Sequence, residues 1–222
     1  MEEIFLQTIG SRERQQDAHF CADGGAFGRV FVVADGLGGM ERGETASKLC
    51  IDAFAEGLGK CGALCEYFEN SIEAAGAAVA REIGAGRGGT TVLAVALEGG
   101  NLRWASVGDS PLLLVRGGRF FRLNENHCVA REGEGAFARG NVLTSCLDGN
   151  KPRFLQIATK PFALGRGDIA AISSDGILSL GEAFLSELFS SAKSLREIKD
   201  GILREYKNVP CADNLTAYLL KI

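Results

Sequence analysis

Residues 30–39 read VFVVADGLGG, an apolar run that ends in an Asp-Gly pair and, after one leucine, two more glycines. A short apolar run rich in β-branched and aromatic residues is typical of a buried strand. A carboxylate at the end of such a strand is held rigidly, and the glycine after it lets the backbone carbonyl approach a cation or its water. The stretch therefore predicts a buried strand that presents Asp35 and the carbonyl of Gly36 to a metal ion.

The same arrangement occurs at 172–176, where ISSDG ends an apolar segment in Asp175-Gly176. Asp-Gly is also a common turn dipeptide, and either copy alone fits that role. Two more acidic residues stand at the borders of expected strands. Asp109 lies between two strand-like segments, and Asp213 precedes the last strand-like segment of the chain. Mg²⁺ and Mn²⁺ prefer oxygen ligands and are commonly held by a few carboxylates from separate elements. The repeated pattern predicts a divalent-cation site built from strand ends.

The hydrophobic periodicity around these motifs predicts strands in meanders and helices in pairs. Strands are expected at 4–9, 18–22, 30–34, 90–97, 102–107, 111–115, 119–123, 169–172 and 215–220, and helices at 44–58, 63–83, 181–192 and 194–206. Each sheet needs a cover for its outer apolar face. The prediction is an α+β fold of two stacked antiparallel β-sheets flanked by helices on both outer faces, an α-β-β-α sandwich. No linker divides residues 1–222, so one domain is expected.

Composition excludes several classes of function. A net charge of −4 and a pI near 5.4 argue against binding to nucleic acid or to an anionic membrane, both of which need basic surfaces. No signal sequence and no apolar run of membrane-spanning length is present, which favours a cytoplasmic location. The seven cysteines lack paired short spacings and favour reduced thiols. With only His19 and His127 in the chain, a zinc site is not expected.

Seven short motifs occur in a fixed order along the chain. They are Arg12-x-x-Gln15-Gln16-Asp17, Asp35-Gly36-x-Gly38-Gly39, Gly43-Glu44-x-Ala46-Ser47, Gly89-Thr90-Thr91, Gly108-Asp109-Ser110, Ser174-Asp175-Gly176 and Asp213-Asn214-Leu215-Thr216. Each is weak alone, but the ordered set resembles the metal-dependent Ser/Thr protein phosphatases of the PPM family, also called PP2C. The resemblance covers residues 10 to 220. That family folds as two antiparallel sheets with helices on both outer faces, in agreement with the periodicity.

The resemblance implies a role for each motif residue. Asp35 would bridge two Mg²⁺ or Mn²⁺ ions, with the Gly36 carbonyl on one and with Asp175 and Asp213 completing the other. The carboxylate of Asp17 would hold metal-bound water, and Asp109 would join Asp175 at a weaker third metal. Arg12 would bind the substrate phosphate, a task that suits its planar, permanently charged fork. Asp35, Asp17 and Arg12 are thus the expected catalytic residues.

The implied reaction is hydrolysis of phosphoserine and phosphothreonine monoesters on proteins, through in-line attack by a metal-bridging hydroxide and without a covalent intermediate. The implied partner is a phosphoprotein, the product of a Ser/Thr kinase. The sequence names neither the substrate nor the kinase, and it leaves the choice of Mg²⁺ or Mn²⁺ and the oligomeric state open.

Several positions depart from the eukaryotic pattern and indicate a bacterial-type member. Leu37 stands where eukaryotic members carry a histidine that protonates the leaving group, so water is expected to take that role. Gln16 stands where they carry a metal-ligating glutamate. The segment 128–150 replaces a longer substrate-contacting flap, which predicts an open site. His19 and His127 are interpreted as structural.

Two alternatives remain open. One is a phosphatase-like regulatory or interaction module that has lost turnover, although such a module need not keep Asp17, Asp35, Asp109, Asp175 and Asp213. The other is a phosphohydrolase with an aspartyl nucleophile, which expects Asp-x-Asp on the first strand, whereas Gly36-Leu37 follow Asp35.

Overall fold

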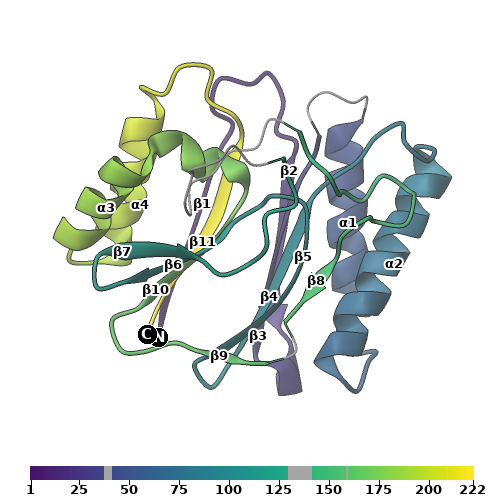
Figure 1. Ribbon diagram of the computed structural model, residues 1–222, viewed down its shortest axis with the longest axis horizontal. Helices are drawn as coiled ribbons and strands as arrows, with labels where there is room; N and C mark the ends of the chain where they lie inside the picture. The colour runs from purple at the N-terminus through teal and green to yellow at the C-terminus, as the bar shows by residue number, and fades with distance from the viewer. Residues whose placement is uncertain (38–41, 130–141, 159) are drawn as a thin grey trace.

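The structure is a computed structural model that describes residues 1–37, 42–129, 142–158 and 160–222. Two antiparallel sheets lie face to face, and a pair of helices covers each outer face (Figure 1). The predicted α-β-β-α sandwich is therefore confirmed.

Among the described residues, the first sheet has the strand order β1-β11-β10-β6-β7. Its strands are β1 (Glu2–Thr8), β11 (Leu215–Lys221), β10 (Ile169–Ser173), β6 (Leu112–Arg116) and β7 (Arg119–Arg122). Gly117 and Gly118 join β6 to β7 with φ angles of +58° and +75°. Two positive φ values in a two-residue loop match the twist of a hairpin and favour glycine. The hairpin predicted at these glycines is confirmed.

The second sheet has the order β2-β3-β4-β5-β8, and β9 also pairs with β5. Its strands are β2 (Asp17–Asp23), β3 (Arg29–Asp35), β4 (Val92–Glu98), β5 (Asn101–Val107), β8 (Gln156–Ile157) and β9 (Phe162–Ala163). The short strands β8 and β9 were not predicted, because two residues each are too few to show a period. Thr90, expected within a strand, makes only isolated bridges to Gly36 and Leu147.

Helices α1 (Gly43–Gly57) and α2 (Leu64–Glu82) cover the second sheet, and α3 (Glu182–Ser191) and α4 (Leu195–Tyr206) cover the first. All four lie where the periodicity placed them. Two short 3-10 helices, η1 (Gly25–Phe27) and η2 (Asp175–Leu180), were not predicted. None of the helices in the described ranges has the length and apolar character that a bilayer crossing requires.

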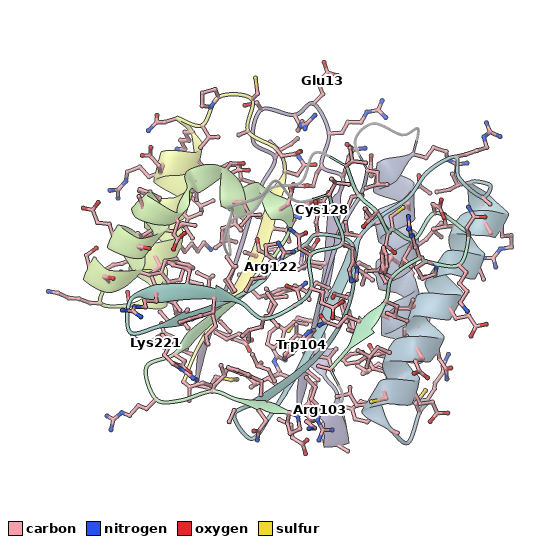
Figure 2. The ribbon with its side chains drawn as sticks, viewed as in Figure 1. Glu13, Arg103, Trp104, Arg122, Cys128 and Lys221 are labelled. Carbon is pink, nitrogen blue, oxygen red and sulfur yellow. The ribbon has the colours of Figure 1, made fainter. Side chains whose placement is uncertain are left out.

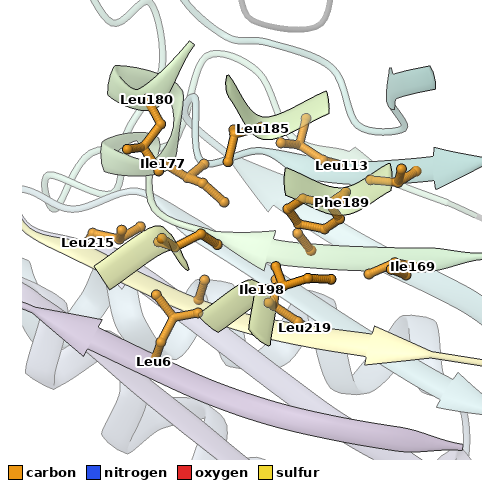
Figure 3. Close-up of a cluster of buried hydrophobic side chains, with 14 of the residues drawn as sticks. Leu6, Leu113, Ile169, Ile177, Leu180, Leu185, Phe189, Ile198, Leu215 and Leu219 are labelled. Atoms are coloured by element: carbon orange, nitrogen blue, oxygen red, sulfur yellow. The ribbon is translucent and has the colours of Figure 1, made fainter. Parts of the chain in front are cut away.

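Three main apolar layers hold the sandwich together. Between the sheets pack Phe31, Leu93, Leu112, Ile172 and Leu220, all essentially inaccessible to water. A second layer joins α1 and α2 to their sheet. The third joins α3 and α4 to theirs and includes Leu113, Leu185, Phe189, Ile198 and Leu219 (Figure 3). Burying each such side chain contributes about 1.5–3 kcal/mol, so these layers fix the strand ends that carry the aspartates.

The chain termini lie together at one end of the sandwich, where Glu2 pairs with Lys221 (Figure 1). Strands β3 and β10 run away from that end, and β11 starts at the opposite one. Asp35 at the end of β3, Asp175 after β10 and Asp213 before β11 therefore gather at the end far from the termini.

Candidate metal centre

The backbone of Asp35 is fixed at both its N–H and its carbonyl. Thr91 Oγ1 accepts a hydrogen bond from the Asp35 N–H at 3.1 Å, and the Asp35 carbonyl accepts from Thr90 Oγ1 at 3.0 Å and from the Thr91 N–H at 2.9 Å. With its main chain held on both sides, Asp35 presents its side chain in one direction. The Gly89-Thr90-Thr91 motif, which had no role in the sequence analysis, thus positions the central carboxylate.

Gly36 is required by packing. A Cβ at this position would lie 2.4 Å from the carbonyl oxygen of Gly43 and 2.7 Å from that of Gln16. Real Cβ atoms essentially never approach so closely, and both neighbours are backbone atoms that cannot move aside. The predicted glycine is therefore needed for the loop to pass between α1 and the segment before β2. Gly38 and Gly39 lie outside the described residues.

A cleft of about 360 Å³ opens at this end of the sandwich. Its lining residues are Arg12, Asp35, Gly36, Leu37, Thr91, Asp109, Leu143, Asp175 and Asp213. Six of the seven predicted site residues are therefore together, and Asp17 is the exception. Leu37 and Leu143 supply an apolar wall. Of the segment 128–150, residues 130–141 lie outside the described part, so the expectation of a short flap is not addressed there.

Asp17 lies behind the cleft, directly opposite Asp35 in the β2–β3 pair. The side chain is buried, and Ser174 Oγ donates a hydrogen bond to Oδ2 at 2.7 Å, while Oδ1 has no hydrogen-bond partner. Burial raises the pKa of Asp17 to about 7; the hydroxyls of Ser174 and Thr216 oppose this shift, and the charges of Asp175 and Asp213 add to it. A buried carboxylate oxygen without a donor is costly. A water molecule held by a neighbouring cation would satisfy it.

Burial and mutual repulsion both act on the carboxylates of the cleft. Burial raises the pKa of Asp35 well above its usual range, and the negative charges of Asp17, Asp175, Asp109 and Asp213 raise it further. Carboxylates forced together in this way favour either a shared proton or bound cations. An oxygen-only set of this kind suits Mg²⁺ or Mn²⁺ and disfavours zinc.

Within the described ranges, no three acidic, histidine or cysteine side chains converge closely enough to enclose an ion by themselves. The donors that line the cleft are carboxylate and carbonyl oxygens, which fit a hydrated divalent cation held by a few carboxylates.

Arg12 and Asp213 form an ion pair at the mouth of the cleft. Arg12 Nη2 lies 2.7 Å from Asp213 Oδ2, and the two side chains are 48% and 36% exposed. The hydrogen bond and charge of Asp213 raise the pKa of Arg12. Exposed pairs of this kind contribute only about 0–1 kcal/mol. Arg12 can therefore leave Asp213 when a stronger anion or a cation arrives.

Asn214 joins the loop between β1 and β2 to the start of β11, and it was quoted in the sequence analysis without a role. Its Oδ1 accepts from the Gln16 N–H at 2.7 Å, and its Nδ2 donates to the carbonyls of Ile9 at 2.8 Å and Arg14 at 3.1 Å. The loop that carries Arg12 is thereby held against the start of β11. Only the Asp213-Asn214 dipeptide pointed to this residue.

The two histidines and the seven cysteines have structural surroundings. His19 Nδ1 lies 2.8 Å from Tyr218 Oη, and its ring packs 4.2 Å from that of Phe5. His127 Nδ1 accepts from the Gly108 N–H at 3.2 Å. None of the seven cysteines forms a disulfide. None of these side chains lines the cleft.

Tyr206 was missed by the sequence analysis. At the end of α4, its buried hydroxyl lies 3.2 Å from the carbonyl oxygen of Gly176 and 3.2 Å from that of Asp213. One hydroxyl thus connects the segment after Asp175 to the segment that carries Asp213. A tyrosine in an amphipathic helix gives no sequence signal for such a contact.

We expect Tyr206→Phe to weaken manganese binding roughly threefold to tenfold and to lower the stability by about 1 kcal/mol, the typical loss for one hydrogen bond. Tyr67→Phe is the matched control, because its hydroxyl donates to the Phe54 carbonyl at 2.9 Å in the other helical layer. The control should lose similar stability and keep its manganese affinity. Calorimetric titration and thermal melting measure both, and equal manganese affinity in the two variants would contradict the prediction.

Comparison with known proteins gives a consistent result. The family model described as protein phosphatase 2C matches residues 7–219. The serine/threonine phosphatase Stp of Listeria innocua is 24% identical over 213 residues, covering 86% of this chain and 84% of that protein. Protein phosphatase PhpP of Streptococcus pneumoniae is 23% identical over 243 residues, covering 100% of this chain and 98% of that protein.

Solved structures with the same fold include the S. agalactiae serine/threonine phosphatase, with a TM-score of 0.84, 24% identity and coverage of 100% of this chain and 99% of that one. The catalytic domain of the phosphatase PstP, solved with two manganese ions, has a TM-score of 0.77 and 22% identity, with 98% and 96% coverage. The Mycobacterium smegmatis phosphatase MsPP, solved with cacodylate, has a TM-score of 0.79 and 25% identity, with 100% and 98% coverage.

Proposed function

The chain belongs to the protein phosphatase 2C (PPM) family, in its bacterial form, and from that premise we propose that it hydrolyses phosphoserine and phosphothreonine monoesters on proteins with the help of divalent cations. One observation supports this most directly. The aspartates at the ends of β3 and β10 and at the start of β11 line one cleft, with Arg12 at its mouth.

The proposed cation ligands are Asp35, the Gly36 carbonyl, Asp175 and Asp213 for two Mg²⁺ or Mn²⁺ ions, with Asp109 and Asp175 at a third, weaker position. When bound, these cations withdraw charge from the phosphoryl oxygens and lower the pKa of water enough for it to attack phosphorus. The manganese ions in the PstP structure support the choice of metal.

The chain's own residues position the reactants. Asp17 offers a buried carboxylate oxygen, Oδ1, as an acceptor that can orient water. Arg12 exchanges its exposed pair with Asp213 for two oxygens of the substrate phosphate, which its fork fits. No covalent intermediate is proposed. Leu37 cannot donate a proton, so solvent water protonates the leaving oxygen through the open mouth of the cleft.

Hydrolysis of a phosphothreonine peptide by the purified protein tests this function. We expect phosphate release with manganese or magnesium and none after chelation. A manganese-loaded protein without turnover would instead favour the regulatory-module alternative, and a trapped acyl-phosphate would favour an aspartyl nucleophile. An anomalous-scattering map from manganese-soaked crystals would locate the ions, and no ion near Asp35 at millimolar manganese would contradict the proposed ligands.

Arg12→Ala should raise KM for a phosphopeptide about tenfold or more, because a charge-assisted hydrogen bond to the phosphate is lost. Manganese affinity should hold or improve, since Asp213 loses its competing partner. Arg14→Ala removes the same charge from the same exposed loop and should leave KM within about twofold. Steady-state kinetics at saturating manganese gives both values. Equal KM in the two variants would rule out Arg12 as the phosphate ligand.

The proposed partner is a phosphoprotein made by a Ser/Thr kinase. A cytoplasmic location is proposed as well, because the spacing of the seven cysteines favours reduced thiols.

A further inference from the structure

Arg122 is a cation of intermediate exposure close to the acidic cleft. It ends β7, the edge strand of the first sheet, opposite Leu113 (Figure 2). Its Nη2 donates a hydrogen bond to the backbone carbonyl of Asp109 at 2.6 Å. Its Nε and Nη1 are buried and have no hydrogen-bond acceptor. No motif in the sequence marks this residue.

A buried guanidinium with unpaired donors is costly, so something must offset it. Burial lowers the pKa of Arg122, and the negative charges of Asp109, Cys128 and Asp175 oppose that shift. Arginine nevertheless stays charged in proteins. A fixed positive charge therefore lies beside the Asp109 side of the cleft and is stabilised by the carboxylates there.

We propose that Arg122 is a built-in counter-cation for the Asp109–Asp175 side of the cleft and that it weakens the binding of a divalent cation on that side. This inference rests on the proposed metal-dependent function. The physical reason is that like charges repel, and repulsion between buried groups is screened little by water or salt.

The two arginines of the site differ in how they act. Arg12 is about half exposed and contacts the Asp213 carboxylate, so a cation or a phosphate can displace it. Two of the side-chain nitrogens of Arg122 are buried and the third is anchored on the backbone of Asp109, so this side chain stays in place when an ion arrives. On the Asp213 side of the cleft, an arriving ion can therefore displace the positive charge of the protein. On the Asp109 side it cannot. Stronger ions at Asp35 and a weaker one at Asp109 follow from this asymmetry.

Counting bound ions tests the proposal without using activity. Wild type and Arg122→Gln are titrated with Mn²⁺, and free Mn²⁺ is measured by electron paramagnetic resonance. Glutamine carries no charge and keeps an amide donor on a shorter side chain. We expect the weakest Mn²⁺ to bind at least tenfold more tightly in Arg122→Gln, or to appear only in that variant. Arg122→Lys keeps the charge and should stay within about threefold of wild type.

Arg119→Gln is the matched control, because Arg119 begins the same short strand but is exposed. Its charge is screened by solvent, so the weakest Mn²⁺ should bind as in wild type. Arg122→Met, which is uncharged and of similar length, is measured in parallel in case glutamine disturbs folding, and its expected gain is the same. Circular dichroism checks that each variant is folded.

The proposal is overturned if the weakest Mn²⁺ binds no more tightly in the folded uncharged variants than in wild type. Weaker binding in the glutamine, methionine and lysine variants alike would mean that Arg122 only holds the Asp109 turn. Failure of the proposed function is a separate result, because it would show as manganese-loaded wild type that does not hydrolyse phosphopeptide, whatever the ion count in the Arg122 variants.

Discussion

Asp35→Asn should lower kcat/KM for a phosphothreonine peptide by roughly 10³-fold or more, the scale on which loss of one preorganised electrostatic group acts. The substitution keeps the size of the side chain and removes its negative charge. Asp35 lines the cleft, and Thr90 and Thr91 hold its backbone in place. Manganese binding should weaken in parallel. Kinetics over a range of manganese concentrations and calorimetry measure the two effects.

The same variant should fold at least as well as wild type without metal. Burial and then the neighbouring carboxylates raise the pKa of Asp35, which means that its charge is unfavourable in the metal-free fold. Asparagine removes that repulsion, so without metal the variant should melt at the same temperature as wild type or higher. Adding manganese should raise the melting temperature of the variant less than it raises that of wild type. Asp52→Asn, an exposed change on α1, should alter neither quantity. A metal-free Asp35→Asn protein that melts well below wild type would show that Asp35 has a structural role instead.

The main features of the fold could be predicted because each rests on a local pattern. The apolar runs at 30–34 and 169–172 mark strands buried on both faces, and the helical periods at 44–58 and 63–83 mark the helices that cover one sheet. The two-residue strands β8 and β9 could not be found in this way. They exist because β5 offers an open edge, which is a property of the assembled sheet.

The site was predictable for residues whose type and spacing are dictated by chemistry or by chain geometry. Asp35 and Gly36 are of this kind, since a strand-end carboxylate and a closely packed glycine leave a signature in the sequence. Tyr206, Ser174 and Arg122 act through contacts with residues far along the chain, as when Ser174 Oγ reaches Asp17 across 157 positions. Such contacts depend on how two sheets stack, which a single sequence does not encode locally.

The seven predicted site residues also differ in their surroundings. Six line the cleft, and Asp17 lies behind it with one oxygen held by Ser174 and the other without a partner. Six residues are therefore within reach of a ligand in the cleft, and Asp17 is not. The separate place of Asp17 could be expected only from family resemblance, because an aspartate at the start of a strand carries no sign of how deeply it is buried.

Gly176→Ala should be among the most destabilising single-methyl changes in this protein, at about 3 kcal/mol or more. The new Cβ would lie 2.2 Å from the backbone oxygen of Asn214 and 2.8 Å from the hydroxyl of Tyr206. This steric clash can be relieved only if η2 moves away from the start of β11. Such a movement separates Asp175 from Asp213. Manganese affinity should therefore fall together with stability.

Gly76→Ala adds the same methyl group but should have the opposite effect on the stability of the protein. Gly76 lies inside α2, and a Cβ there meets no atom within 4 Å. Alanine should therefore stabilise the helix by roughly 0.5–1 kcal/mol and leave manganese binding unchanged. In a chain of this length 1 kcal/mol corresponds to about 2–4 °C, so the two variants should melt roughly 10 °C apart or more. Similar melting points would mean that η2 and β11 separate at little cost, and Asp175 and Asp213 would then not be held as one rigid pair.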